Sequence, residues 1–387
     1  MAHLLKRPAI HSGRLERFIG AAKLARVQSH MLNACGDGRR WYGPPIFLAD
    51  VPGAVYVTPD GDFHGTFARG YFASALDEIE GRMKRLWREA GRQAREPMLA
   101  AGFASISDVL SRSTQGYRQY PSGIVAKNGP TGVANVSSTL WRLGTNPAAG
   151  AAGSAAPGGR ACDNTTTGAL AFTNPSSGTS HLVGAKFWSS VVNNELLLYD
   201  RLFDVAKTMN STATEAVTGV PTRYQSTTVS NQDYIGGNFL FIEVGGTQLA
   251  ATAHNWTVCL YTNQAGTAGQ TMPSLAGNSG GIVDRLDHPT FSWAAPLAAG
   301  DSGIKALTQM QCSALVATGA VNFVIGHPIG MMLFYLAGPM LPFGWLTDVD
   351  LAPRIFDSAC LAFLELNKPS TTATSYGGKI SVVNAAP

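Results

Sequence analysis

The spacing of apolar residues changes from a helical to a strand-like period near residue 113. In the first 112 residues, apolar side chains recur every three or four positions over 14–32 and again over 73–96, which predicts two amphipathic helices. Between them, residues 41–72 are rich in Gly and Pro. This segment predicts a hairpin or extended arm, with a turn at Pro59-Asp60-Gly61.

After residue 113 the helical period disappears, and short β-type runs alternate with turn signals. The segment 146–168 is rich in Gly, Ala and Ser and predicts a loop. We therefore predict a mainly β fold, an antiparallel β-sandwich of jelly-roll type preceded by a helical arm. The expected domains are a basic helical part (1–112), a connecting region (113–168) and the sandwich (169–387). The predicted strands cover 169–173, 182–188, 196–203, 238–244, 256–262 and 323–325.

Charge is distributed unevenly along the chain. Only 14% of the residues are charged, against about 25% in a typical soluble protein, so we expect much of the surface to face other protein. The positive balance lies entirely in 1–112. The basic helix over 14–32 is expected to contact a neighbouring subunit rather than nucleic acid, although packaged nucleic acid remains an alternative partner. The candidate contact residues are Leu15, Phe18, Ile19, Leu32, Arg14, Arg17, Lys23 and Arg26.

One long stretch carries no charge. No Asp, Glu, Lys or Arg occurs between Lys305 and Asp348, which raises the possibility of a membrane span. Polar and helix-breaking residues such as Asn322, His327 and Pro328 interrupt the stretch. We therefore expect no membrane contact and interpret the stretch as buried strands or a subunit contact.

Motifs that could carry catalysis lack their partners. Gly277-Asn278-Ser279-Gly280-Gly281 is similar to the nucleophile loop of trypsin-like proteases, but a triad also needs a histidine base and a buried Asp. The nearest upstream histidine, His254, lies too close in sequence for that family. Asp200 and Asp204 flank Arg201, and we expect a hydrogen-bonded Asp–Arg corner there rather than an acid–base pair. No catalytic residue and no enzyme activity is predicted.

Cofactor and metal sites are not predicted either. The histidines include no HxH, HxxxH or HExxH spacing, and no phosphate-binding glycine motif occurs. The cysteines are scattered and include no CxxC, so we expect buried free thiols, as is usual for a protein that folds in a reducing cytoplasm.

Three motifs in the β region carry a resemblance. They are Leu196-Leu-Leu-Tyr-Asp-Arg-Leu-Phe203, Tyr261-Thr-Asn-Gln-Ala-Gly-Thr-Ala-Gly-Gln-Thr271 and Ala298-Ala-Gly-Asp-Ser-Gly-Ile-Lys-Ala306. In this order they resemble virion structural proteins of tailed bacteriophages. The resemblance covers roughly 165–367 and leaves the first 112 residues outside.

The resemblance implies a virion component that is assembled in the cytoplasm of the bacterial host. Its expected role is that of a capsid decoration, cement or shell protein that self-assembles and stabilises the particle. The partners would be other copies of the chain and neighbouring major capsid, portal or neck proteins. The alternatives are a virion-attached receptor- or carbohydrate-binding β module and a neck or tail structural protein.

Overall fold

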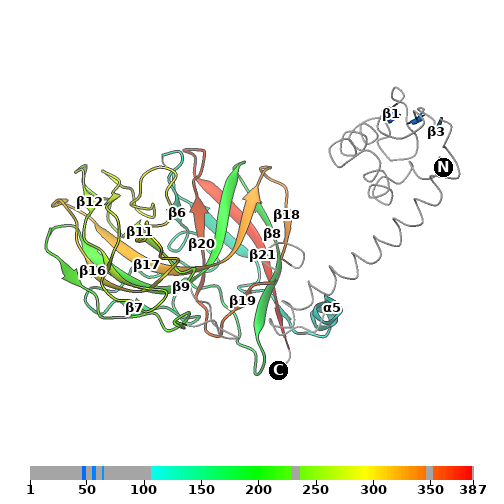
Figure 1. Ribbon diagram of the computed structural model, residues 1–387, viewed down its shortest axis with the longest axis horizontal. Coiled ribbons are helices and arrows are strands. Elements are labelled where there is room, and N and C mark those ends of the chain that lie inside the picture. Colours follow the sequence, from blue (N-terminus) through cyan, green and yellow to red (C-terminus); the bar gives the residue numbers. More distant parts are fainter. Residues whose placement is uncertain are drawn as a thin grey trace. The chain divides into compact units, whose positions relative to one another are not determined.

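The chain divides into two compact units, residues 1–96 and 97–387, which we describe separately. The predicted helices over 14–32 and 73–96 lie outside the described residues, as do all the candidate contact residues of the basic helix. The computed structural model describes residues 46–48, 55–57, 63–64, 106–131, 133–227, 236–345 and 352–385 (Figure 1).

The described part of the first unit is a small antiparallel sheet. Its order is β1 (Ile46–Leu48), β2 (Val55–Val57) and β3 (Phe63–His64). Val57 in β2 pairs antiparallel with Phe63 in β3, and the predicted turn at Pro59-Asp60-Gly61 lies outside the described residues. The hairpin predicted within 41–72 is therefore present.

The second unit is mainly β-structure, and its sheets are antiparallel with very little helix. Residues 113–168 contribute the first four of its strands. In chain order the strands are β4 (Arg118–Gln119), β5 (Val125–Gly129), β6 (Ser138–Thr139), β7 (Arg160–Ala161), β8 (Ser180–Ser189), β9 (Asn194–Thr208), β10 (Glu215–Ala216), β11 (Phe239–Val244), β12 (Asn255–Trp256), β13 (Leu260–Asn263), β14 (Gln270–Thr271), β15 (Leu275–Ala276), β16 (Ile304–Met310), β17 (Ala320–Phe334), β18 (Leu341–Gly344), β19 (Arg354–Ile355), β20 (Leu361–Leu366) and β21 (Thr374–Asn384).

A central sheet has the order β11-β17-β9-β20-β6, and β7 continues along β9. Its two long strands, β9 and β17, each have 15 residues. Phe203 pairs with Ile325 and Arg201 with Gly326, which leaves Leu202 as the extra residue of a β-bulge. Because a bulge shifts the alternation of side chains by one, Arg201 and Asp204 point to the same face of the sheet.

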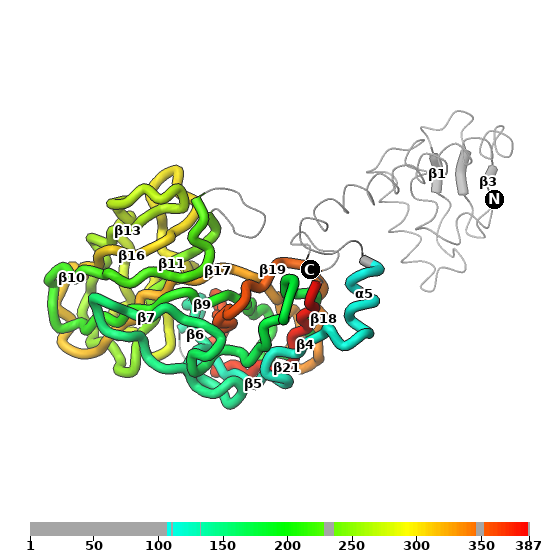
Figure 2. The backbone as a smooth tube through the Cα atoms, turned by 90° about the horizontal axis from the view of Figure 1, so that it is seen from below, coloured from blue at the N-terminus to red at the C-terminus, as the bar shows by residue number. Residues whose placement is uncertain are grey.

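A second sheet has the order β18-β8-β21-β4, with β19 paired to β8 and β5 paired to β21. Its middle strand, β21, is the last described strand in the sequence. Two smaller sheets, β10-β16-β13-β14 and β12-β15, complete the unit. Within the unit, β13 and β16 lie at one end and β21 lies at the other (Figure 2).

A short helix, α5 (Ile106–Thr114), lies at the end of β21 (Figure 2). It was not predicted from the sequence. Val109 is buried in a small cluster with Val383 and Ala385. Asp108 in the first turn and Arg112 in the last turn suit the helix dipole and are hydrogen-bonded at 2.9 Å.

The central sheet is covered on both faces by three apolar clusters. One cluster lies between it and the second sheet, another between it and the four-stranded sheet, and the third on its opposite face. Burial of such side chains contributes about 1.5–3 kcal/mol each. Representative members are, in this order, Leu198, Phe187 and Ile380; Val205, Phe323 and Leu307; Tyr199, Phe241 and Trp141.

Most strand predictions are confirmed. The runs 182–188, 196–203 and 323–325 fall within β8, β9 and β17, and the run 238–244 matches β11 except for its first residue. The prediction over 169–173 is wrong, because this segment is a loop whose Leu170 and Phe172 are buried in the core without strand pairing. The run 256–262 is broken into β12 and β13.

The uncharged stretch after Lys305 forms the end of β16 and all of β17 and β18, as expected for strands. In the part of the chain that the structure describes, no helix is both long and apolar enough to cross a membrane.

Candidate functional site

Two of the three motifs behind the bacteriophage resemblance contact each other. Tyr261 Oη donates to Asp301 Oδ2 at 2.6 Å, and Asn263 Nδ2 donates to Asp301 Oδ1 at 2.7 Å. The Ala298 amide in turn donates to Tyr261 Oη at 2.7 Å. Burial and the bond to Asp301 raise the pKa of Tyr261 to about 12, so the phenol stays a donor. These residues fasten β13 to the loop before β16.

In the third motif, the two carboxylates lie on opposite faces of β9. Asp200 receives two hydrogen bonds from Arg223, Nε at 2.8 Å and Nη2 at 2.6 Å, and a third from the Cys360 amide. Asp204 lies beyond the bulge and accepts from Arg201 Nε at 3.1 Å and from Arg160. The two carboxylates therefore pair with different arginines and do not form an acid–base pair.

Arg201 is the centre of a fully buried ionic network. Its Nη2 lies 2.8 Å from Glu243 Oε1, and its guanidinium lies 4.7 Å from the centre of the Trp141 ring. Asn322 Nδ2 donates to the same Glu243 oxygen. Burial opposes the charge of Arg201, but Glu243 and Asp204 outweigh it and raise its pKa well above the usual value. Arg201 therefore keeps its charge, and the network has a structural role.

The protease-like loop is also held by a polar cluster. His254 Nδ1 lies 3.0 Å from the Thr252 carbonyl oxygen, and His254 Nε2 lies 2.9 Å from Asp287 Oδ2. A carbonyl oxygen only accepts, so Nδ1 carries a proton, and the carboxylate favours a second proton on Nε2. Burial alone would lower the pKa of His254, but Asp287 raises it overall.

Both nitrogens of His254 are thus occupied, and neither can accept a proton from Ser279, which is exposed. Gly277 lies so close that a Cβ there would stand 2.1 Å from His254 Nε2. Asp287 also accepts from the Trp256 indole at 2.9 Å. The arrangement lacks the geometry of a serine-protease triad. It instead stabilises the turn at 277–281.

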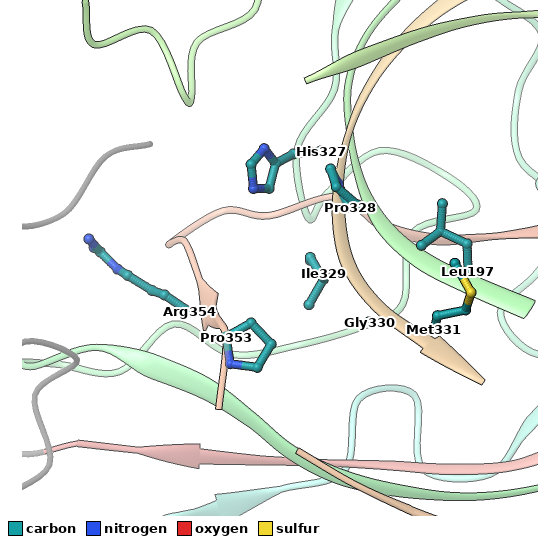
Figure 3. Close-up of a pocket in the computed structure, with 8 residues that line it drawn as sticks. All are labelled: Leu197, His327, Pro328, Ile329, Gly330, Met331, Pro353 and Arg354. Carbon is teal, nitrogen blue, oxygen red and sulfur yellow. The ribbon is translucent and has the colours of Figure 1, made fainter. Parts of the chain in front are cut away.

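A pocket of about 310 Å³ opens beside the bulged part of β17. Figure 3 shows His327 and Ile329 projecting from β17 toward the side on which Pro353 and Arg354 lie. Arg354 is the only charged residue among those that line the pocket. Burial lowers the pKa of His327 to about 3, so the imidazole is neutral. The residues that line the pocket include no carboxylate and no thiol.

The second half of β17 and the turn that follows expose an apolar strip. Its five side chains have 49% to 60% of their surface exposed. Met331 and Leu333 alternate with the buried Met332 and Phe334, as in a strand with one outer face. On that outer face a soluble monomer normally carries polar residues. We define the apolar strip as Met331, Leu333, Tyr335, Leu336 and Met340.

The absence of charged residues from 306 to 347 indicated the region in which the apolar strip lies. It did not indicate which residues of that region are exposed. All residues from 331 to 336 are apolar. Because side chains in a strand alternate between its two faces, such a run indicates that some of them are exposed. The pocket at His327 and Arg354 was missed, because β17 and β19 are brought together only by the fold.

Cys162, Cys259, Cys312 and Cys360 are free and buried, as expected, and Cys35 lies outside the described residues. Within the described ranges, no group of three His, Cys, Asp or Glu residues is arranged to hold a metal ion. No family model, curated protein or solved structure matches the chain.

Proposed function

We propose that the chain is a structural component of a bacteriophage virion, a capsid decoration, cement or shell protein that self-assembles and stabilises the particle. The observation that carries this proposal is the apolar strip, which lies within a stretch that has no charged residue from 306 to 347. Charged residues are depleted at the centres of protein interfaces, and contiguous exposed apolar surface is rare on monomers.

The strip also lies at an open strand edge. β11 pairs with β17 only as far as Gly326. From His327 to Phe334, β9 is the only described strand that pairs with β17. Pro328 in this half and Pro342 in β18 limit uncontrolled strand addition, because proline lacks the amide donor. An open, uncharged edge protected in this way suits a contact with a defined partner.

We further propose that the second unit contains the β-sandwich of jelly-roll type that the sequence predicts over 169–387. The shared core between the central and second sheets supports this architecture. In the proposed assembly, the basic helix over 14–32 contacts a neighbouring subunit through Leu15, Phe18, Ile19 and Leu32. Removal of residues 1–40 should then leave the second unit folded but reduce its copy number on purified particles.

The test of the apolar strip is a double substitution, Leu333→Asp with Tyr335→Asp, in the full chain. The wild-type protein should be present in purified particles in many copies, and the variant should be lost from them and stay monomeric in analytical ultracentrifugation. Ile124→Asp is the matched control, because Ile124 is 74% exposed but lies just before β5.

Absence of the wild-type chain from particles would contradict the virion role. Normal occupancy by the double variant would instead show that another surface makes the contact. Gel densitometry of the particles distinguishes these outcomes.

A further inference from the structure

The exposed cations of the second unit gather at one place. Most Lys and Arg side chains after residue 112 are buried or half-buried, and the three exposed ones are Arg118, Lys186 and Lys379. All three surround Tyr120. Arg118 Nη1 lies 3.3 Å from Tyr120 Oη, and Lys379 Nζ lies 4.9 Å from the centre of the ring. The hydrogen bond from Arg118 and the three positive charges lower the pKa of Tyr120.

This arrangement works against the stability of the chain itself. Lys379 in β21 stands directly opposite Lys186 in β8, and like charges at such positions are destabilising. Among the described residues, no ion pair includes Arg118, Lys186 or Lys379. An anion that bridges the two lysines would remove the repulsion.

Aromatic rings accompany the cations on the same outer face. Trp188 is two residues from Lys186 in β8, so both side chains lie on one side of the sheet. Gly377 pairs with Trp188, and a Cβ at Gly377 would stand 2.3 Å from the indole nitrogen. The ring therefore lies close over the strand. Tyr120 is 41% exposed. We define the basic face as Arg118, Tyr120, Lys186, Trp188 and Lys379.

We propose that the basic face binds the phosphate backbone of a nucleic acid, with bases stacking on Tyr120 and Trp188. Cations beside accessible rings are the combination that single-stranded nucleic acids use, phosphate to cation and base to ring. An acidic protein surface would pair with the lysines but would leave the two rings without planar partners. The inference goes beyond the assembly role, because the apolar strip and the basic face share no residue.

The test is a titration of the full chain with a labelled single-stranded oligonucleotide at several salt concentrations. Each lost phosphate contact reduces the slope of log K against log salt by about 0.7. The variant Lys186→Gln with Lys379→Gln should therefore reduce the slope by about 1.4 and weaken binding by tenfold or more at low salt. Trp188→Leu should weaken binding about fivefold or more and leave the slope unchanged.

The matched control is Lys23→Gln with Arg26→Gln, which instead removes two cations from the segment 14–32, predicted from the sequence to be a basic helix. An effect of the control as large as that of the Lys186 and Lys379 variant, or an unchanged slope in the latter, would overturn the proposal. Equal binding of polyglutamate and the oligonucleotide to the wild type would also overturn it and point to an acidic protein.

A gain of thermal stability in Lys379→Glu, together with loss of oligonucleotide binding, would support the proposal and exclude misfolding as the cause. Copy number on particles is measured for the same variants, so that failure of this inference and failure of the virion role are distinguished.

Discussion

Charged residues are arranged in opposite ways on the two large sheets. On the central sheet, each charge of the network around Arg201 has a partner of opposite sign: the buried Arg201 pairs with Glu243 and Asp204, and Asp204 also pairs with the half-buried Arg160. On the outer face of the second sheet, Lys186 and Lys379 stand side by side with like charge.

The difference follows from the cost of an unpaired charge in each place. A buried charge without a partner costs several kcal/mol, whereas two like charges at the surface cost less than about 1 kcal/mol because water screens them. Folding therefore fixes the pairing on the central sheet. It leaves the outer face of the second sheet free to be arranged for a partner.

The largest expected effect tests the paired network. Arg201→Met leaves Glu243 without its cation in a buried site, so the free energy of unfolding should fall by about 3–5 kcal/mol. The matched change on the outer face, Lys379→Met, should alter it by no more than about 0.5 kcal/mol. Denaturant unfolding of both variants measures the difference, and similar losses would show that the comparison between the sheets is wrong.

The next largest effect is a loss of stability at acidic pH, which arises from three buried neutral histidines. Burial lowers the pKa of His181 and His288 to about 4 and of His327 to about 3. As pH falls below about 6.5, these histidines become protonated in the unfolded chain but stay neutral in the folded chain. Their contribution to the free energy of unfolding is therefore present above that pH and is lost as pH falls. Between pH 7 and 5 each histidine should cost about 1–2 kcal/mol.

His288→Gln sharpens this test, because His288 Nε2 accepts the Ile242 amide at 3.0 Å and a protonated ring cannot. The variant should show a smaller loss of stability between pH 7 and 5 than the wild type. The pH dependence that His254 contributes has the opposite sign. Asp287 raises the pKa of His254, so its contribution to the free energy of unfolding is present at low pH and is lost as pH rises through the raised value. An unchanged pH profile in His288→Gln would contradict the assignment.

The smallest effect concerns the like-charged pair itself. Lys379→Glu replaces repulsion by attraction opposite Lys186, so the free energy of unfolding should rise by about 0.2–1 kcal/mol at low salt. Added salt should reduce the gain, since both side chains are exposed. A loss of stability would mean that Lys379 contributes mainly through its contact with the Tyr120 ring.

Local pattern in the sequence predicted the strands whose alternation is simple, such as those now seen as β8 and β11. It did not predict the bulge at Leu202, because the extra residue is recognised only when β9 is paired with β17. The loop over 169–173 was mistaken for a strand because Leu170 and Phe172 are apolar for reasons of tertiary packing. The basic face combines residues in or next to β4, β8 and β21 that are spread over more than 250 positions, and no local pattern could show it.

The position of β21 sets the order in which the molecule can be completed. This strand lies between β8 on one side and β4 and β5 on the other, although it is made after all of them. During translation, β4 and β5 cannot join β8 in one sheet until β21, which ends at residue 384, has left the ribosome. Pairing between strands that are distant in the sequence is also the slow part of β folding. Lys379 and Lys186 meet only at that moment. A nascent or truncated chain therefore has no basic face, and any ligand that needs it would select finished molecules.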